Sequence, residues 1–460
     1  MTAPLHIIIL AAGQGTRMKS AKPKVLHPVA GQAMLGHVIH CARCLNAAGV
    51  HVVIGHGADQ VRSWAEQSGI EGEDLHWVEQ SEQLGTGHAV NQAMPGIPDS
   101  ARVLVLYGDV PLTRPETLTP LVEAEGLCLL SVRLDDPTGY GRILRDGQNQ
   151  LSGIVVQKDA DPQQRAINEV NTGMLAAPAA ELKGWLARVG NDNAAGEYYL
   201  TDCVALAVTD GVAASAIVAG DAVEVAGVNN RLQLAQQERA LQRRQADVLM
   251  ADGVHLLDPA RFDLRGELRC GRDVQIDIDC VFEGRVDLAD GVKIGPHCLL
   301  KNVKLGAGTV VEAHSVLEDC EAAAACTIGP FARLRPQARL LKGAKVGNFV
   351  EIKKATLGEG AKANHLAYVG DATVGARVNI SAGVITCNYD GANKFATEIG
   401  DDAFVGTDTQ LVAPVKIGKD AFVAAGSTIT KDVPDGALAI CRARGQKHIE
   451  NWQKPRKNKG

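Results

Sequence analysis

The sequence has few aromatic residues, no long apolar segment and no excess of positive charge. Phe, Trp and Tyr make up only 4% of its 460 residues, which indicates narrow, tightly stacked layers. No apolar run reaches the roughly 18 residues of a membrane span, and the basic and apolar regions of a signal peptide are missing. The net charge of −6 argues against nucleic acid as the main partner. We therefore expect a soluble cytoplasmic protein that acts on small molecules and binds neither nucleic acid nor a membrane.

The eleven cysteines also lack a disulfide-like framework, and their number is odd. Reduced thiols in a cytosol are the simplest interpretation. Cys41 and Cys44 form a CxxC motif flanked by His37 and His40, which is one half of a possible zinc site. No second pair follows, and apolar residues recur around the motif at helical spacing. Ordinary helix packing is therefore the favoured interpretation of this motif.

The N-terminal stretch predicts a strand that leads into a glycine-rich turn. Ile7 to Leu10 is a short apolar run, typical of a strand buried on both faces. The small residues 11–16 let the backbone approach a ligand and leave amide groups free for phosphate oxygens. Arg17 and Lys24 follow, and a triphosphate needs such cations. The spacing is neither the dinucleotide fingerprint nor the Walker loop, so an ordinary turn with two solvated bases is an alternative at this point.

The complete stretch resembles the signature of sugar-nucleotide pyrophosphorylases. Leu-Ala-Ala-Gly-x-Gly-Thr-Arg-Met, which begins at Leu10, is followed by Pro-Lys-Val-Leu from Pro23. This match covers many more positions than the glycines alone. It favours the phosphate-binding interpretation over the ordinary turn.

Up to about Val228, short apolar runs alternate with helix-like stretches. This pattern predicts an α/β fold with a largely parallel sheet, whose ligands bind beyond the carboxyl ends of the strands. The apolar run 103–106 ends in Tyr107-Gly108-Asp109. A carboxylate at that edge can hold Mg²⁺ against a phosphate, although a lone Asp after a strand more often caps a helix. The preceding Tyr-Gly favours the metal site.

Further polar segments occur between the predicted strands. Gln80 can donate and accept hydrogen bonds at the edge of a uracil, with Gly85-Thr86 beside it, or it can belong to a plain polar loop. Residues 138–142 and 169–173 are tight-turn segments with polar side chains. Gly227-Val-Asn-Asn230 precedes a long helix predicted for Asn230 to about Ala251, which Gly253 ends.

From about Val254 the pattern changes to a repeat of six residues. An aliphatic residue recurs beside a small one in eight similar segments, among them Val292-Lys-Ile-Gly295 and Val415-Lys-Ile-Gly418. This is the hexapeptide repeat of a left-handed parallel β-helix. We expect a thin triangular core without room for aromatic rings, with small residues at the corners.

Several segments within the repeats are too polar to be spacers. Arg335, Glu351, Lys353, His365 and Tyr368 occur on what would be adjacent coils. A single loop histidine usually has no special role. Here it accompanies basic groups, a carboxylate and several amides, and this combination favours a functional site.

Nearly the whole chain resembles the bacterial bifunctional N-acetylglucosamine-1-phosphate uridyltransferase / glucosamine-1-phosphate acetyltransferase family. Both sets of motifs occur in the right order on either side of the predicted helix. The resemblance implies a Rossmann-like nucleotidyltransferase domain at 1–229, a linker helix at 230–252 and a left-handed β-helix acetyltransferase domain at 253–460. It also implies a homotrimer formed through the β-helix, with sites between subunits.

For the first domain the resemblance implies uridylyl transfer from UTP to N-acetylglucosamine 1-phosphate with release of pyrophosphate. Asp109 and Asn229 would hold Mg²⁺, while Arg17 and Lys24 would neutralise the leaving pyrophosphate as catalytic residues. The implied contacts to UTP or its product are Leu10, Ala11, Ala12, Gly13, Lys24, Gln80, Gly85, Thr86, Tyr107, Gly108, Asp109, Gly141, Asn171 and Asn229. Among them, Gly141 and Asn171 would face the sugar.

For the second domain it implies acetyl transfer from acetyl-CoA to the amine of glucosamine 1-phosphate. His365 would be the general base, since an imidazole titrates near the working pH, and Glu351 would orient it. The implied contacts to the sugar phosphate are Arg335, Lys353, Tyr368 and Asn379. The implied contacts to acetyl-CoA are Ala382, Asn388, Tyr389, Thr407, Ala425 and Arg442.

One position departs from the family pattern. The family's glutamate that contacts the sugar is replaced by Val156, and valine cannot accept a hydrogen bond. In a strand Gln157 would point to the opposite face, so we expect weak binding of the sugar phosphate. Two alternative functions are a β-helix that only oligomerises or regulates a nucleotidyltransferase, and a regulatory subunit that only binds sugar nucleotides. The basic tail 454–459 is expected to be a solvated end, and the alternative is an aid to binding the CoA phosphates.

Overall fold

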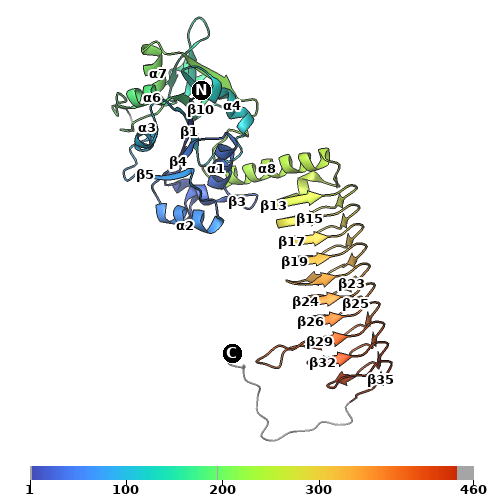
Figure 1. The fold of residues 1–460 in the computed structure, drawn as a ribbon. Helices are drawn as coiled ribbons and strands as arrows, with labels where there is room; N and C mark the ends of the chain where they lie inside the picture. Colours follow the sequence, from blue (N-terminus) through green and yellow to red (C-terminus); the bar gives the residue numbers. More distant parts are fainter. Residues whose placement is uncertain (1–2, 194, 443–460) are drawn as a thin grey trace. The chain divides into compact units, whose positions relative to one another are not determined.

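The chain forms two compact units, and the boundary between them lies within one long helix. The structure is a computed structural model that describes residues 3–193 and 195–442, so the basic tail 454–459 lies outside the described residues. The first unit is Met1–Leu241 and the second is Gln242–Gly460, and the division falls within α8 (Arg231–Ala251). Figure 1 shows a sheet with helices in the first unit and a regular stack of strands in the second. In the described ranges, no helix has the length and apolar composition needed to cross a bilayer.

A nine-stranded sheet forms the centre of the first unit. Its main path runs β11-β7-β10-β6-β1-β4-β5, and the β8–β9 hairpin joins β10. Strand β10 is antiparallel to both neighbours, whereas β1, β4, β5 and β6 are parallel to one another. The strands are β1 (Leu5–Leu10), β4 (Gly49–Ile54), β5 (Leu75–Glu79), β6 (Arg102–Tyr107), β7 (Leu127–Arg133), β8 (Arg142–Arg145), β9 (Leu151–Val155), β10 (Glu169–Pro178) and β11 (Ala214–Val218), and β2 (Pro28–Val29) pairs with β3 (Gln32–Ala33).

Helices cover the sheet and confirm the predicted α/β fold. They are α1 (Met34–Cys44), α2 (Ala58–Ser68), α3 (Thr86–Ala93), α4 (Pro115–Glu123), α5 (Pro162–Arg165), α6 (Ala179–Leu186) and α7 (Asp202–Thr209). Ile7 and Ile9 of β1 pack in one apolar cluster and Ile8 in another, and all three are fully buried. Because alternate side chains of a strand point to opposite faces, the continuous apolar run places β1 at the centre of the sheet. Its carboxyl end therefore delivers the glycine-rich turn to one edge.

The CxxC motif lies on α1. Cys41 is buried in the core, whereas Cys44 is exposed and its Sγ lies 3.8 Å from His40 Nε2. His37 Nε2 instead lies 2.9 Å from the carbonyl oxygen of Val29. Within the described residues, no three His, Cys, Asp or Glu side chains are grouped to hold a metal ion. Cys41 packs in the apolar core of the first unit, as the helical spacing around the motif predicts.

Two parallel strand ladders form the second unit, a parallel β-helix (Figure 1). The eleven-stranded ladder contains β12 (His255–Leu256), β14 (Gln275–Ile276), β16 (Lys293–Ile294), β18 (Val310–Val311), β20 (Thr327–Ile328), β23 (Lys345–Asn348), β25 (Lys362–His365), β27 (Asn379–Ile380), β30 (Phe404–Val405), β33 (Phe422–Val423) and β35 (Leu438–Ala439). The 13-stranded ladder contains β13 (Phe262–Cys270), β15 (Cys280–Leu288), β17 (Leu299–Leu305), β19 (Val316–Ala322), β21 (Arg333–Leu334), β22 (Arg339–Leu340), β24 (Glu351–Leu357), β26 (Tyr368–Val374), β28 (Ile385–Cys387), β29 (Thr397–Ile399), β31 (Gln410–Val412), β32 (Val415–Ile417) and β34 (Thr428–Ile429).

The β-helix core is mostly aliphatic, but it is not free of rings. Phe262 and Phe282 are almost fully buried on neighbouring coils, with ring centroids 5.6 Å apart. The expectation that rings do not fit was therefore wrong for the first coils. These coils lie beside the C-terminal part of α8, where Ala246 joins the same apolar cluster.

One corner of the β-helix is occupied by large ring-bearing residues, whereas small residues were expected at the corners. His297, His314, Phe331 and Phe349 turn one corner on successive coils, each with a positive φ between 56° and 59°. Their rings stack with centroids 4.8, 4.8 and 5.2 Å apart, because neighbouring parallel strands lie at a ring-stacking distance. This stacking offsets the left-handed backbone conformation, which costs roughly 1–2 kcal/mol per residue.

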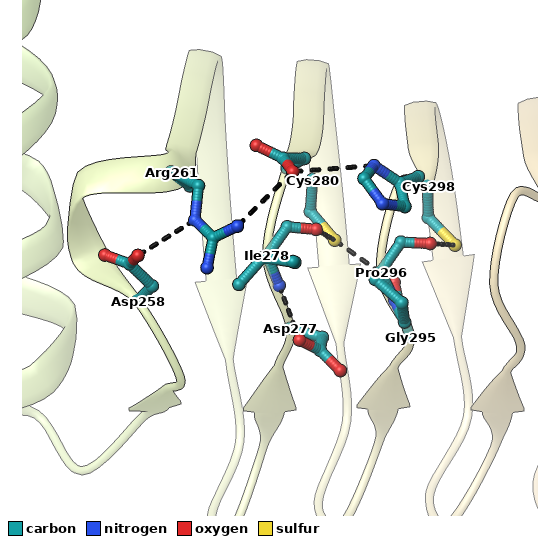
Figure 2. Close-up of polar contacts among 10 residues, drawn as sticks. Asp258, Arg261, Asp277, Ile278, Cys280, Gly295, Pro296 and Cys298 are labelled. Atoms are coloured by element: carbon teal, nitrogen blue, oxygen red, sulfur yellow. Dashed lines mark hydrogen bonds and ion pairs between the residues drawn. The ribbon is translucent and has the colours of Figure 1, made fainter.

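Buried thiols satisfy backbone groups in the first coils (Figure 2). Cys280 Sγ donates to the carbonyl oxygens of Gly295 (3.2 Å) and Ile278 (3.6 Å). Burial raises the pKa of Cys280 to about 12, so this thiol is a structural donor rather than a nucleophile. On the surface nearby, Arg261 Nε donates to Asp258 at 2.9 Å.

Candidate active sites

A cavity of about 280 Å³ opens at the carboxyl edge of the first unit's sheet. The ends of β1 and β6, the loop after β5 and the start of α3 supply its walls, as the parallel strand arrangement predicts. Its lining residues are Leu10, Ala11, Ala12, Gly13, Lys24, Val25, Gln80, Gln83, Gly85, Thr86, Ala89, Tyr107, Asp109 and Glu197. Most residues predicted to bind UTP are therefore gathered here, whereas Arg17, Gly108, Gly141, Asn171 and Asn229 do not line this cavity.

Two glycines explain how the backbone forms this cavity. A Cβ at Gly13 would meet no atom within 4 Å, so the turn after β1 is open to a ligand. Gly85 has a φ of +108°, and a Cβ there would lie 2.6 Å from the carbonyl oxygen of Tyr198. Only glycine allows this close approach at the start of α3.

Side-chain amides fix the loop after β5. The Gln80 amide nitrogen lies 3.0 Å from His88 Nδ1 and 3.3 Å from the carbonyl oxygen of Gly85. Gln83 Nε2 donates to the carbonyl oxygen of Ala12 at 2.9 Å, which joins this loop to the glycine-rich turn. Sequence reasoning missed Gln83, because nothing in its surroundings in the chain distinguishes it from other loop glutamines.

Charged groups converge at one end of the cavity. The Lys24 ammonium contacts the Asp109 carboxylate, and it lies 3.4 Å from Asn229 Oδ1. Arg17 Nη2 donates to the same Asn229 oxygen at 3.0 Å. Burial, together with the nearby Asp109 charge, raises the pKa of Tyr107. The predicted metal ligands and the predicted phosphate-binding cations thus occupy one small region.

The segment predicted to face the sugar is formed by β8, β9 and β10. Asn171 N donates to the Gly141 carbonyl oxygen at 2.9 Å, so the structure brings these two predicted residues together. A Cβ at Gly173 would lie 2.6 Å from the Tyr107 ring, so glycine there lets the ring pack against β10. These contacts connect the sugar-facing segment with the cavity wall.

The expected orientation of Gln157 was wrong. Strand β9 ends at Val155, and Val156 to Lys158 enter a turn in which Asp159 N donates to the Val156 carbonyl oxygen at 2.9 Å. The alternation of a strand therefore does not apply to Gln157. Its Oε1 accepts hydrogen bonds from Arg142 Nη2 (2.5 Å) and Gly139 N (3.4 Å).

In the second unit, basic groups gather around Glu351. Arg335 Nη1 donates to Glu351 Oε1 at 2.7 Å across two coils. The positive charges of Arg335 and Lys394 lower the pKa of Lys353, which shows that three cations lie close together. Lys394 was not among the predicted contacts, because it comes from a loop between β28 and β29 whose path the repeat does not define.

Asn348 holds His365, and sequence reasoning missed this residue. The two are in register on β23 and β25, and His365 Nδ1 lies 2.8 Å from Asn348 Oδ1. In the described chain, the hydrogen-bond partner of the imidazole is thus Asn348, while the Glu351 carboxylate pairs with Arg335. The 17-residue separation of Asn348 and His365 is one coil, and this spacing is the signal that could have identified the pair.

Asn388 joins Tyr368 to the same region. Its Nδ2 donates to Asp371 Oδ2 at 2.6 Å and lies 3.5 Å from the Tyr368 hydroxyl. A Cβ at Gly370 would lie 2.3 Å from that hydroxyl, so glycine makes room for the phenol. Asp371, which Lys354 pairs with at 3.3 Å, is a further residue that the motifs did not indicate.

The predicted acetyl-CoA contacts lie on the later coils. Asp408 N donates to the Ala382 carbonyl oxygen and Gly426 N to that of Thr407, both at 2.8 Å, so Ala382, Thr407 and Ala425 mark one corner on successive coils. Arg442 Nε and Nη2 donate to the Ala425 carbonyl oxygen at 3.2 and 3.1 Å. Away from this corner, Asn379 Nδ2 donates to Ser381 Oγ at 3.1 Å, and Tyr389 is 57% exposed.

Comparisons with known proteins cover both units. The MobA-like NTP transferase domain matches residues 7–139, and the bacterial transferase hexapeptide (six repeats) matches residues 396–431. Proteins called "Bifunctional protein GlmU" match over the full length. The one from Alkalilimnicola ehrlichii is 57% identical over 457 residues, covering 99% of this chain and 97% of that protein. Those from Marinobacter nauticus (55%) and Stutzerimonas stutzeri (57%) cover 99% and 98% of this chain and 100% and 99% of their own length. The chain therefore belongs to the bifunctional GlmU family.

Proposed function

We propose that the chain makes UDP-N-acetylglucosamine from glucosamine 1-phosphate in two reactions. The second unit transfers an acetyl group from acetyl-CoA to the sugar amine. The first unit then transfers a uridylyl group from UTP to N-acetylglucosamine 1-phosphate and releases pyrophosphate. The observation that supports this proposal best is that each unit brings its own set of motif residues together, in a chain related over its full length to bifunctional proteins.

In the uridylyl transfer, the sugar-phosphate oxygen attacks the α-phosphorus of UTP. No covalent protein intermediate is required, so the protein acts by positioning and by neutralising charge. The open backbone at Gly13 and the Gln80 amide bind the nucleotide. Arg17 and Lys24 hold the phosphates and stabilise the negative charge that develops on the leaving pyrophosphate.

The residues at the charged end of the cavity suit a magnesium ion. Asp109 and Asn229 offer one carboxylate and one amide oxygen, both hard ligands of the kind that Mg²⁺ takes. These oxygens already converge on a cation, the Lys24 ammonium, so the donor set fits the ion. An ion held there supplies charge neutralisation on the substrate phosphates, and these phosphates and water would complete its coordination.

In the acetyl transfer, the sugar amine attacks the thioester carbonyl carbon and the CoA thiolate leaves. If Nδ1 of His365 donates to Asn348, Nε2 carries the lone pair that takes the amine proton. That proton leaves with CoA as its thiol. Arg335, Lys353 and Lys394 hold the sugar phosphate, whose negative charge relieves the repulsion among the three cations.

We further propose that the β-helix forms a homotrimer and that the enzyme works in the cytoplasm. Phe331, Phe349 and Leu366 are 47%, 56% and 59% exposed along the corner next to His365. An open groove of about 870 Å³ runs along the prism between Arg285 and Lys394. The exposed apolar corner is of a kind that a second copy of the chain would cover.

Two substitutions test the proposal, and both activities are assayed on the same purified preparation of each protein. We expect His365→Ala to abolish thiol release from acetyl-CoA and to leave pyrophosphate release from UTP intact, and Asp109→Ala to do the reverse. His314→Ala is a matched control, because this histidine lies on the same β-helix but at the stacked corner. A folded variant that lost both activities would contradict the two-site model, and a wild-type protein without thiol release would favour a purely oligomerising β-helix. Light scattering on the same sample gives the particle mass.

A further inference from the structure

Arg142 is a buried cation that the proposed reactions do not use. It lies at the start of β8 and is only 1% exposed. Its Nη2 donates to Gln157 Oε1 at 2.5 Å and its Nη1 donates to the Tyr140 carbonyl oxygen, while Nε is buried without a partner. In the described ranges, its hydrogen-bond acceptors are thus neutral oxygens. A buried guanidinium without a carboxylate partner is costly, so the few contacts it has matter.

The contacts of Arg142 connect two segments of the hairpin. Tyr140 and Gly139 belong to the loop before β8, and Gln157 belongs to the turn after β9. Gln157 Oε1 also accepts from Gly139 N at 3.4 Å, so one amide oxygen holds both the arginine and the loop. The loop ends at Gly141, whose carbonyl oxygen accepts from Asn171 N.

The strand register places Arg142 between β9 and β10. Arg142 pairs with Val155 on β9 and with Val170 on β10. Gly141 lies just before β8, and a Cβ built on it would lie 3.0 Å from Ile154 Cγ2 and 4.0 Å from Asn171 Cβ, so it is on the side of these two residues. The guanidinium donates to the Tyr140 carbonyl oxygen and to Gln157, and through these contacts it can fix the backbone that presents Gly141.

We propose that Arg142 and Gln157 form a positioning pair that fixes residues 138–141 and so sets the affinity of the first unit for its acceptor, the sugar 1-phosphate. This inference rests on the proposed uridylyl transfer. It predicts an effect on the acceptor and not on UTP, because no residue of 134–160 lines the cavity assigned to the nucleotide. Within the pair, Gln157 is the residue to change, since it can be replaced without removing the buried arginine.

The test compares Gln157→Met with Gln157→Glu. Methionine keeps the shape of the side chain but cannot replace the amide oxygen that accepts from the guanidinium. Residues 138–141 then lose this support, and we expect the KM for N-acetylglucosamine 1-phosphate to rise by about tenfold. The kcat and the KM for UTP should stay within about twofold of wild type. Glutamate accepts the same hydrogen bonds and should restore the low KM. Gln148→Ala, in the β8–β9 turn, is the matched control.

The outcomes separate this inference from the proposed function. A wild-type protein without uridylyl transfer would refute the proposed function itself, and the inference with it. If the wild type is active but Gln157→Met leaves the acceptor KM unchanged, or lowers kcat alone, the positioning role is wrong. Should Gln157→Met fail to fold, Gln157→Asn shortens the side chain and makes the same prediction. The acetyl transfer of each variant reports whether the rest of the chain is intact.

Discussion

At the residue scale, Lys24 occupies the region where a metal ion is proposed to bind. Its ammonium is shared between the oxygens of Asp109 and Asn229, and the Lys24 and Asp109 side chains are only 14% and 15% exposed. A divalent ion that takes the same oxygens brings positive charge against the ammonium in a partly buried place, where repulsion is strong. The metal should therefore bind well only when phosphates draw Lys24 away.

This competition can be measured without catalysis. We expect Lys24→Met to raise the affinity of the nucleotide-free protein for Mn²⁺ by about tenfold, the change that roughly 1.4 kcal/mol of relieved repulsion gives. Electron paramagnetic resonance counts free Mn²⁺ directly. Lys22→Met is the control, because this lysine is exposed on the same loop. An affinity that stays the same or falls in Lys24→Met means that the ammonium does not compete.

Val156 provides a second prediction at this scale. The sequence resemblance implies a glutamate at this position. In the structure Val156 follows the end of β9 and directly precedes Gln157, the partner of Arg142. We expect Val156→Glu to lower the KM for N-acetylglucosamine 1-phosphate by about ten- to a hundredfold, since a hydrogen bond to a charged group contributes roughly 1.5–3 kcal/mol. The KM for UTP should not change. Steady-state kinetics with each substrate varied in turn check this, and an unchanged or higher sugar KM would show that another group already fills the role.

At the scale of elements, three neighbouring strands place histidines in a row. His6 on β1, His51 on β4 and His76 on β5 lie near the amino ends of these strands, at the edge opposite the cavity. His6 Nδ1 lies 3.0 Å from His51 Nε2, and the His51 and His76 rings are 4.9 Å apart. Burial, together with the neighbouring His76 and His6, lowers the pKa of His51 to about 4. His51 is therefore neutral in the folded protein near pH 6, whereas the unfolded chain binds a proton there.

The sign of the resulting pH dependence follows from this difference. The unfolded state binds more protons between pH 6.5 and about 4, so stability falls as the pH is lowered through this window and levels off below it. One such group contributes up to about 3 kcal/mol. Urea unfolding followed by tryptophan fluorescence reports on the first unit, which holds Trp64, Trp77 and Trp185. His51→Gln should flatten the curve, and an equally steep curve in this variant would assign the acid sensitivity to other groups.

The elements themselves were largely predictable, and the contacts between them were not. The apolar run Ile7–Leu10 and the six-residue repeat carry their periodicity in the chain, so the central strand and the β-helix follow from local pattern. The end of β9 at Val155 does not follow, because a further valine comes next. The Asn348–His365 contact depends on the register of two coils. Lys394 reaches Lys353 through a loop between coils, whose path only tertiary packing decides.

At the scale of the whole molecule, the β-helix repeats its core position with nearly constant spacing. Ile276, Ile294, Val311, Ile328, Val346, Ala363 and Ile380 occupy equivalent places on successive coils, which gives 17 or 18 residues per coil. All candidate acetyltransferase residues lie at Arg335 or beyond. In such a stack each coil contacts only its neighbours, so stability is close to a sum over coils.

Removing one entire coil should therefore leave the chemistry intact. Deletion of residues 295–311 joins Ile294 to Glu312 and replaces one core position by its equivalent. We expect acetyl transfer within about twofold of wild type, with a lower unfolding temperature because one coil interface is lost. Deletion of residues 295–303, about half a coil, breaks the register and should abolish acetyl transfer. Loss of activity in the full-coil deletion would show that the early coils do more than support the later ones.

The number of coils sets the length of the β-helix. Because each coil advances the chain by one strand spacing, about 4.8 Å, the number of coils before Arg335 is a length rather than a chemical property. Shortening the prism by one rung brings its first coil about 4.8 Å nearer to the acetyltransferase residues and changes none of them. The early coils therefore set a distance within the β-helix, and this distance can be changed by removing or adding one coil at a time.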